Sequence, residues 1–389
     1  MNSQCALLVV DDNEDNRYTL TRRLQREGYT DLTVAVDGEQ ALGLLGSRPF
    51  DLVLLDVMMP GLNGYEVLER MRVDGRLRHV PVIMISALDE IDSVIRCVEL
   101  GAEDYLAKPF NPTLLRARVG ATLEKKRLRD EIVTSARRME VELDKAREVQ
   151  LSMVPREFPG ATPEAPVDVF GMLEPARETG GDLYDCFWIS PGKLCLAIGD
   201  VSGKGASAAL FMARTKAVVR VVATSLAQAG RTPAASELMQ KTNDELVREN
   251  SYAMFVTLFL CIVDAATGQV EWCGAGHAAP FLVTPGDGVG QIALGRSIPV
   301  GVREALLWTS GTVSLAPGAC LVLFTDGVTE AANEREELFG DERLAAALRG
   351  AAGEAPQGMV RSILREVRSF AGSAQQSDDI AVLACRWGA

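Results

Sequence analysis

The chain has 389 residues, with 40 Lys and Arg against 53 Asp and Glu and a net charge of −13. This acidic balance argues against nucleic acid as a partner and against a polybasic membrane anchor, because both need a basic face. With 47% apolar and 24% charged residues, the composition is that of a globular protein of about two or three domains. No apolar run reaches the ~20 residues that span a bilayer. The first residues also lack the basic stretch of a signal peptide, so we expect a cytoplasmic protein without membrane attachment.

The residue types that commonly bind transition metals are scarce. The eight Cys are scattered singly without any CxxC pair, and His79 and His277 are the two histidines. Zinc sites and thioredoxin-like redox chemistry are therefore unsupported, and the thiols are expected to be reduced. Any metal must be held by oxygen ligands, which favours Mg²⁺ or Mn²⁺.

Residues 1–121 alternate short apolar runs with amphipathic stretches of helical length. Continuous apolar runs separated by helices predict an α/β domain, a doubly wound five-stranded parallel sheet with helices on both faces. The predicted strands cover 6–10, 32–36, 52–57, 82–86 and 104–107.

Residues 122–153 are rich in helix formers and contain neither Gly nor Pro, so they predict a helical linker. Mostly apolar or small side chains recur at a 4-3-4-3 spacing, at Ile132, Ala136, Met139, Leu143, Ala146, Gln150 and Met153. This spacing favours a coiled coil and hence a homodimer, and the alternative is a single solvated helix.

Residues 154–389 open with a stretch punctuated by Pro and Gly and then predict a second domain. Strand-like runs cover 167–173, 183–189, 193–201, 255–264, 269–273, 279–283, 311–315, 320–325 and 380–385. Helical blocks are predicted at 206–227, 233–250, 341–350 and 354–370. Many strands with clustered helices indicate an α+β fold, a layered β-sandwich with flanking helices.

In the first domain, charged and hydroxyl side chains follow the ends of the predicted strands. Asp11 and Asp12 end the first strand, Asp56 ends the third, Ser86 ends the fourth and Lys108 follows the fifth. Ligands bind at the carboxyl ends of strands in an open parallel sheet. Clustered carboxylates repel one another unless a cation neutralises them. We therefore predict a divalent cation beside a hydroxyl and an ammonium that can hold a phosphoryl group.

Residues 1–121 resemble a two-component response-regulator receiver domain, of flavodoxin-like fold, through LLVVDDN, LVLLDVMMPGLNGYE, VIMISA and GAEDYLAKPF. The resemblance implies that Asp56 accepts phosphate from a sensor histidine kinase or a small phosphodonor. It implies that Asp12 and Asp56, with the Met58 carbonyl, hold one Mg²⁺, and that Asp11 acts through water.

The same resemblance assigns the response to phosphorylation. Ser86 and Lys108 would contact the phosphoryl oxygens, and Tyr105 would be the aromatic switch residue. This agrees with the charge that phosphorylation adds, which a hydroxyl and an ammonium can pair with.

In the second domain, aspartates again adjoin predicted strands. Asp182 stands in GGDLYD, Asp200 in IGDVSGKG, Asp326 in FTDGVTE and Asp378 in QSDDIAV. A single Asp-Gly is ordinarily a turn, but four separated acids with hardly any His suit a binuclear site for hard cations. Two such cations would share a water, lower its pKa and aim it at phosphorus.

Residues 154–389, together with AREVQLSMVP of the linker and the GAGHAAP turn, resemble the PPM family of metal-dependent type 2C protein serine/threonine phosphatases. The bacterial SpoIIE-type branch is the most similar. The resemblance implies that Asp200 bridges two Mg²⁺ or Mn²⁺ ions and that the Val201 carbonyl binds one of them. Asp326 and Asp378 would complete the other ion, and Asp182 would ligate or orient a water. All four acids would be catalytic, with a metal-activated water as the nucleophile.

One position departs from the pattern of this family. Ser202 stands where eukaryotic relatives carry a histidine proposed as general acid, so the proton donor is unassigned. His277 could replace that histidine, but we favour an imidazole that hydrogen-bonds within its own turn.

Arg177 could contact the substrate phosphate, because a guanidinium fits phosphate bidentately, or be an ordinary surface residue. Lys204 does not belong to a P-loop, since GxxxxGK is absent.

Together, the two resemblances imply a response regulator with a protein phosphatase output, controlled by phosphorylation of Asp56. The SpoIIE-type likeness suggests that the substrate is a STAS-type anti-sigma-factor antagonist phosphorylated on serine or threonine. The alternative is a phosphatase-shaped module that sequesters a phosphoprotein without hydrolysing it. Four mutually repelling acids argue against this alternative, because mere binding does not need them.

Overall fold

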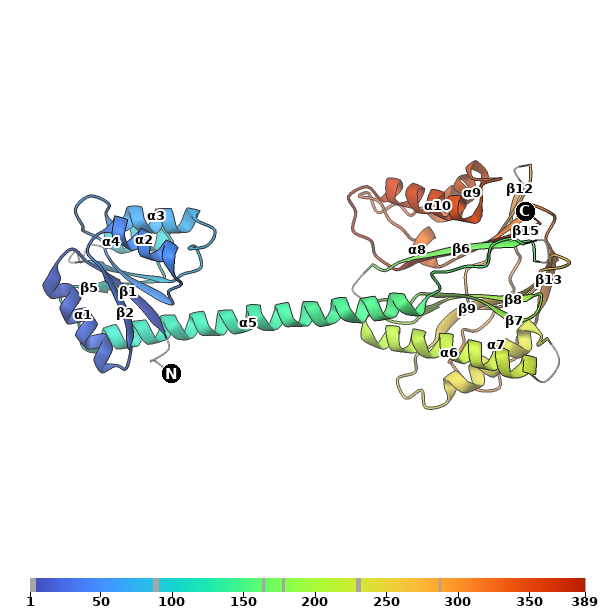
Figure 1. The fold of residues 1–389 in the computed structure, drawn as a ribbon, viewed down its shortest axis with the longest axis horizontal. Helices are drawn as coiled ribbons and strands as arrows, with labels where there is room; N and C mark the ends of the chain where they lie inside the picture. The colour runs from blue at the N-terminus through green and yellow to red at the C-terminus, as the bar shows by residue number, and fades with distance from the viewer. Residues whose placement is uncertain are drawn as a thin grey trace. The chain divides into compact units, whose positions relative to one another are not determined.

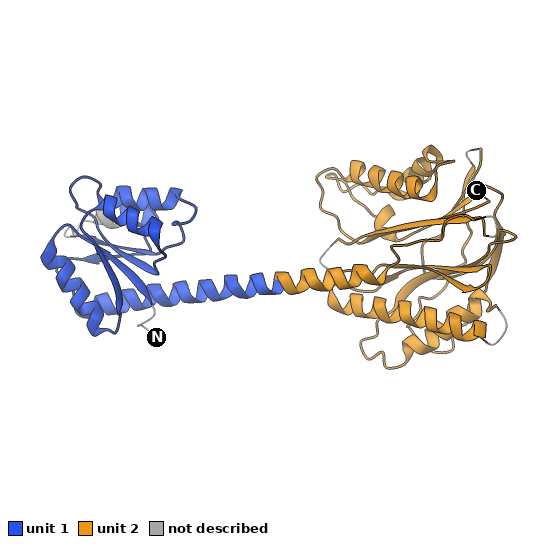
Figure 2. Ribbon diagram, in the orientation of Figure 1, with its two compact units in different colours: residues 1–139 blue, residues 140–389 orange. Residues whose placement is uncertain are grey.

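The structure is a computed structural model that describes residues 5–86, 91–162, 165–176, 179–228, 232–286 and 288–388, with the backbone alone for 91–94. The chain divides into two compact units, residues 1–139 and 140–389 (Figure 2).

The first unit is built on a parallel sheet with the strand order β2-β1-β3-β4-β5 (Figure 1). Its strands are β1 Ala6–Val10, β2 Asp31–Ala35, β3 Leu52–Asp56, β4 Val82–Ser86 and β5 Asp104–Ala107. Its helices are α1 Glu14–Arg26, α2 Gly38–Ser47, α3 Gly64–Val73, α4 Ile91–Glu99 and the start of α5 Pro112–Met153.

Successive side chains of the central strand β3 enter opposite cores, as the two-residue period of a strand requires. Val53 and Leu55 pack with α2, α3 and α4, whereas Leu52 and Leu54 pack with α1 and the first turns of α5. Both faces of the sheet are therefore covered by helices, which explains why the strands are continuously apolar.

The second unit consists of two antiparallel sheets, ordered β13-β10-β9-β8-β7 and β12-β11-β14-β15-β6. Its strands are β6 Val167–Glu174, β7 Leu183–Ser190, β8 Lys193–Val201, β9 Val256–Asp264, β10 Gln269–Ala275, β11 Phe281–Thr284, β12 Gly288–Gln291, β13 Gly311–Ser314, β14 Cys320–Phe324 and β15 Ile380–Trp387. Its helices are α6 Ala206–Gln228, α7 Ala235–Val247, α8 Asp326–Thr329, α9 Gly340–Gly350 and α10 Pro356–Ala371.

Three apolar cores hold these layers together. One core lies between the two sheets and joins residues such as Phe259 and Leu383. A second packs α6 and α7 on the first sheet, and a third packs α9 and α10 on the second sheet. Figure 1 shows the resulting order of helices, sheet, sheet and helices. The predicted sandwich with flanking helices is confirmed.

Some elements differ from the sequence-based expectation. Strand β12 and the one-turn helix α8 were not predicted. Helix α5 is continuous over 42 residues and includes the whole predicted linker. Gln150, expected on the apolar seam of that helix, is instead buried and bound to the backbone of Gly180. None of the helices in the described residues is long and apolar enough to cross a membrane.

Candidate functional site

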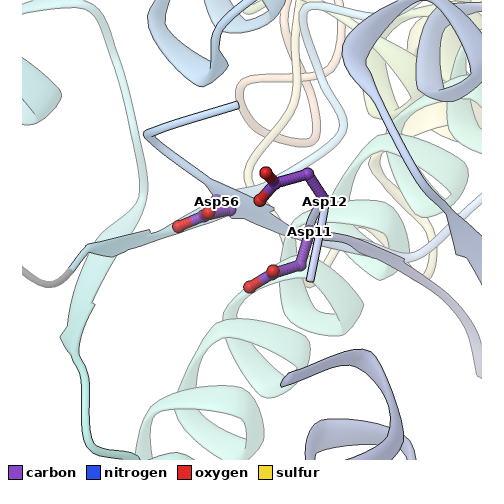
Figure 3. A group of neighbouring side chains, drawn as sticks. All are labelled: Asp11, Asp12 and Asp56. Atoms are coloured by element: carbon purple, nitrogen blue, oxygen red, sulfur yellow. The ribbon is translucent and has the colours of Figure 1, made fainter. Parts of the chain in front are cut away.

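The first site lies at the carboxyl ends of β1 and β3. Asp11, Asp12 and Asp56 are neighbours there (Figure 3), and one carboxylate oxygen from each lies within 4.8 Å of the other two. The Lys108 Nζ lies 2.8 Å from Asp11 Oδ2 and 2.9 Å from Asp56 Oδ1. The structure therefore brings together four of the residues that the sequence singled out.

Local hydrogen bonds and burial set the charge of this cluster. Asp11 Oδ1 accepts bonds from the Asn13 N–H at 2.9 Å and from Asn16 Nδ2 at 3.1 Å, which leaves Oδ2 for Lys108. Burial raises the pKa of Asp56 to about 6, although the bond from Lys108 opposes this. One ammonium does not compensate three clustered carboxylates, and an oxygen donor set of this kind fits a Mg²⁺ ion.

The other predicted residues of the first unit flank this cluster. Ser86 is the buried last residue of β4, and its carbonyl accepts the Lys108 N–H at 2.8 Å. Tyr105 is half-buried in β5, in register with Met84 of β4. Met58 lies two residues beyond Asp56 with its side chain 64% exposed. The roles assigned to Ser86, Tyr105 and the Met58 carbonyl stay predictions.

The second site gathers acids from both sheets of the second unit. Asp182 directly precedes β7 and Asp200 is the penultimate residue of β8, where the neighbouring residues Leu183 and Gly199 are paired. From the other sheet, Asp326 begins α8 two residues after the end of β14, and Asp378 lies two residues before the start of β15.

Thr325 connects the two sheets at this point. Its hydroxyl donates to Asp182 Oδ2 at 2.6 Å and accepts the Ala381 N–H at 2.9 Å. Thr325 is fully buried and Asp182 is 2% exposed. The sequence analysis did not identify Thr325 as a functional residue, and its position between an apolar strand and Asp326 was the available signal.

Burial and mutual repulsion make these acids hard to ionise. The pKa of Asp182 is raised well above its usual value by burial and by the charge of Asp200. Burial, with repulsion from Asp326 and Asp378, raises the pKa of Asp200 to about 7. The pKa of Asp326 is also raised, by burial and by Asp378. Such a cluster fits bound divalent cations, which would offset the repulsion.

The loop that carries Asp182 is held by Asp379, whose role the sequence analysis left unassigned. Asp379 accepts the Ala176 N–H on Oδ1 and the Gly181 N–H on Oδ2, both at 2.8 Å. Both loop glycines are required by close approach: a Cβ on Gly180 would lie 1.8 Å from Asp379 Oδ2. A Cβ on Gly181 would lie 2.7 Å from the Val201 carbonyl oxygen.

The same loop is bound to the end of α5. The Gln150 side chain is 4% exposed. Its amide donates to the Gly180 carbonyl at 2.5 Å and accepts the Gly180 N–H at 3.1 Å. Any displacement of the last turns of α5 therefore acts directly on the backbone two residues before Asp182.

Lys204, for which the sequence predicted no role, lies beside Asp378. Its Nζ is 2.9 Å from Asp378 Oδ2 and 2.8 Å from the Ser377 carbonyl. Arg177, the predicted contact for substrate phosphate, lies outside the described residues.

Ser202, which stands in place of the general acid proposed for eukaryotic relatives, and His277 both form structural contacts. Ser202 Oγ accepts the Phe255 N–H at 3.0 Å. The buried His277 ring bonds Thr257 Oγ1 at 2.9 Å and the Phe324 carbonyl at 3.1 Å, so its partners lie outside the turn in which we expected them. Burial lowers the pKa of His277 to about 4. The neutral ring donates to Phe324 and fixes the strand end that precedes Asp326.

The two sites differ in how closely their acids meet. In the described part of the chain, the cluster of Asp11, Asp12 and Asp56 is the one group of three acids with ligand oxygens within 4.8 Å. No three acids in the described part of the second unit meet this criterion.

Comparisons with known proteins identify both units. The family model of the response regulator receiver domain matches residues 7–120. The model of Stage II sporulation protein E (SpoIIE) matches residues 190–388, just over half of the chain. The chain belongs to the SpoIIE family. The first unit of the chain is a receiver domain. The part of the second unit that the SpoIIE model matches includes Asp200, Asp326 and Asp378 but begins after Asp182.

Curated relatives match parts of the chain. Protein IcfG of Synechocystis sp. (strain ATCC 27184 / PCC 6803 / Kazusa) is 28% identical over 265 residues, which are 63% of this SpoIIE-family chain and 41% of IcfG. The probable transcriptional regulator ycf27 of Guillardia theta is 44% identical over 119 residues, 31% of this chain and 45% of that protein. The chain therefore spans less than half the length of these relatives.

Solved structures agree on the fold of the second unit. The SiaA-PP2C domain of Pseudomonas aeruginosa has a TM-score of 0.57 and 23% identity, and the match covers 65% of this chain and 98% of that one. The PP2C phosphatase domain of SpoIIE from Bacillus subtilis has a TM-score of 0.50 and 21% identity, with 58% and 64% covered. The second unit therefore has a PP2C-like fold.

Proposed function

We propose that this chain is a response regulator whose output is a metal-dependent protein serine/threonine phosphatase, controlled by phosphorylation of Asp56. The observation that carries the proposal is the mutual charge repulsion among Asp182, Asp200, Asp326 and Asp378, which adjoin strands of two sheets. Acids that raise one another's pKa lower the stability of a protein unless cations bind them, so their convergence favours a metal-dependent reaction.

The residues of the second site divide into ligands and supports. Divalent cations, when bound, would lower the pKa of a water and offset negative charge on a phosphoryl group. Asp200, Asp326 and Asp378, with the Val201 carbonyl, supply the oxygen ligands. Asp182 would bind a cation or orient its water, and Thr325 fixes the position of Asp182. His277 is engaged at both ring nitrogens and is assigned no part in proton transfer.

The receiver cluster supports Asp56 as the phosphoacceptor. Its carboxylate is in contact with Lys108 and lies beside Asp11 and Asp12. A phosphoryl group at Asp56 would gain ion pairing from Lys108 and from the Mg²⁺ that the acids hold. The phosphate donor would be a sensor histidine kinase or a small phosphodonor.

The proposed substrate is a phosphoserine or phosphothreonine of a STAS-type anti-sigma-factor antagonist. Membership of the SpoIIE family supports this substrate class. All eight cysteines are free thiols, which suits a reducing cytoplasm. The rival function is sequestration of a phosphoprotein without hydrolysis.

We also propose that two copies pair through residues 122–153, the linker between domains 1–121 and 154–389. Ile132, Val133 and Met139 on this part of α5 are 69%, 61% and 66% exposed. A second copy of the same helix would cover them, as in a coiled coil. Sedimentation of the full chain should show a dimer that Ile132→Glu weakens, and a monomeric wild type would contradict the pairing.

Hydrolysis of a generic phosphate ester by the full chain tests the catalytic proposal. Turnover should require Mn²⁺ or Mg²⁺, stop with a chelator and be lost in Asp200→Asn. Asp341→Asn, which changes an exposed acid in the first turn of α9, is the matched control and should keep full activity. Absence of turnover with either metal, before and after phosphorylation of Asp56, would favour sequestration.

A further inference from the structure

The connection between β12 and β13, residues 292–310, contains no helix or strand and is nevertheless firmly held. Val300 exchanges two backbone hydrogen bonds with Val256 of β9, both at 2.9 Å. The fully buried Asn243 of α7 accepts the Gly301 N–H and donates to the Arg303 carbonyl, both at 3.0 Å. Connections longer than ~12–15 residues without regular structure are uncommon and usually functional.

This connection and β10 border a partly open cavity of about 500 Å³. Cavities that bind small ligands usually have ~300–1,000 Å³. Two indole rings and two guanidinium groups contribute to the wall, together with hydroxyl groups; they belong to Trp272, Trp308, Arg296, Arg303, Ser297 and Thr309. The wall is preformed, because Trp308 Nε1 donates to the Ile298 carbonyl at 3.1 Å and Ser297 Oγ donates to the Gly274 carbonyl at 2.8 Å.

The charge of the cavity is opposite to that of the chain. The chain carries 53 acids against 40 bases, yet no Asp or Glu is among the residues that line this cavity. Arg296 and Arg303 are both exposed, and neither forms an ion pair with any residue that the structure describes.

We propose that this cavity binds an anionic group, a carboxylate or a phosphate, carried on an apolar body. A guanidinium pairs with either anion bidentately. Trp272 and Trp308, which also line the cavity, would contact the apolar body. The ligand is either a free small molecule or an acidic segment of a partner protein, which present the same chemistry.

The cavity wall is connected to the acid cluster of the second unit. Ser297 Oγ accepts the Gly276 N–H at 3.0 Å. Gly276 precedes His277, whose ring bonds the Phe324 carbonyl at the strand end before Asp326. A partner held in the cavity would thus contact the segment that supports the acids, although binding there does not require hydrolysis.

Calorimetric titration of the full chain tests the proposal, with excess chelator so that no cation occupies either acid cluster. The probes are phenyl phosphate and a glutamate-rich peptide that contains one Phe. The double variant Arg296→Gln/Arg303→Gln should weaken binding at least tenfold. Arg361→Gln, which removes an exposed arginine of α10, should leave binding unchanged.

The two probes separate the sources of the anion. Binding of phenyl phosphate alone would assign the cavity to a free small molecule, and binding of the peptide would assign it to a partner's acidic segment. No saturable binding of either probe, or equal weakening by all the arginine variants, would overturn the proposal. Metal-dependent hydrolysis is measured separately on the same variants, so a failure of the proposed phosphatase function is distinguishable from a failure of this site.

Discussion

Thr325 holds Asp182 from the opposite sheet, through a hydrogen bond between residues 143 positions apart. Thr325→Val keeps the side-chain volume but removes the hydroxyl that donates to Asp182. Residues that orient metal ligands typically contribute about 10–100-fold to activity or metal affinity. We therefore expect Thr325→Val to lower metal-dependent hydrolysis by about this factor, and Thr325→Ser to keep most of it. Equal activity of the Val and Ser variants would show that the hydrogen bond has no role.

Asp200 should make cation binding in the second unit depend on pH. Burial first, and then Asp326 and Asp378, raise its pKa to about 7. The Asp200 carboxylate must be deprotonated to bind a cation, so below this pKa each bound cation displaces one proton. The affinity for the cation should therefore rise by about tenfold per pH unit up to this pKa and level off above it. Mn²⁺ titrations at pH 6, 7 and 8 measure this slope. They are made in Asp56→Asn, which disables the receiver cluster, and affinity that is the same at pH 6 and 8 would contradict the expectation.

The aspartates of both sites could be predicted from the sequence, whereas the residues that hold the second site in place by hydrogen bonds could not. Asp56 and Asp200 each end an apolar run, so strand pattern and residue type sufficed. Thr325 and Asp379 act through hydrogen bonds to residues distant in the chain. Such contacts depend on how two sheets stack, which local spacing does not encode.

Helix α6 is fixed to β7 by a buried ion cluster. Asp185 is 1% exposed, Lys216 Nζ lies 2.6 Å from its Oδ1, and Arg220 bonds both of its oxygens at 2.5 and 2.6 Å. Removing one member leaves an unpaired buried charge, so Asp185→Ala should cost about 3–5 kcal/mol of unfolding free energy. Asp185→Leu/Lys216→Met, which replaces the pair with apolar groups, should cost less. Urea unfolding measures both, and a larger loss in the double variant would contradict this account.

At the level of elements, the apolar runs predicted the strands because burial on one or both faces leaves a clear pattern. Strand β8 begins and ends where the sequence indicated, at Lys193 and Val201. Strand β12 has the sequence GVGQ and was missed, because two glycines and one apolar residue give no alternation. The apolar spacing along α5 was interpreted as one seam, yet Gln150 at its end forms hydrogen bonds within the second unit.

On the scale of the whole molecule, one helix belongs to both units. Leu115 and Val119 near the start of α5 are buried in the receiver core, and Gln150 near its end binds Gly180 beside Asp182. A continuous helix transmits rotation or displacement, whereas a Gly/Ser segment does not. Four Gly/Ser residues inserted after Ser135 should therefore leave basal hydrolysis intact and abolish its change upon phosphorylation of Asp56.

A seven-residue helical insertion at the same point is the matched control for this experiment. Seven residues return a helix nearly to its starting phase, with a drift of about 20°, so side chains on both sides of the insertion keep their relative direction. The response to a small phosphodonor should survive in this variant and in the wild type. Asp56→Asn should give no response in any background, which separates receiver phosphorylation from direct effects of the donor. If the Gly/Ser variant responds as fully as the helical one, α5 does not carry the signal as a rigid element, and control must reach Asp182 without the bonds between Gln150 and Gly180.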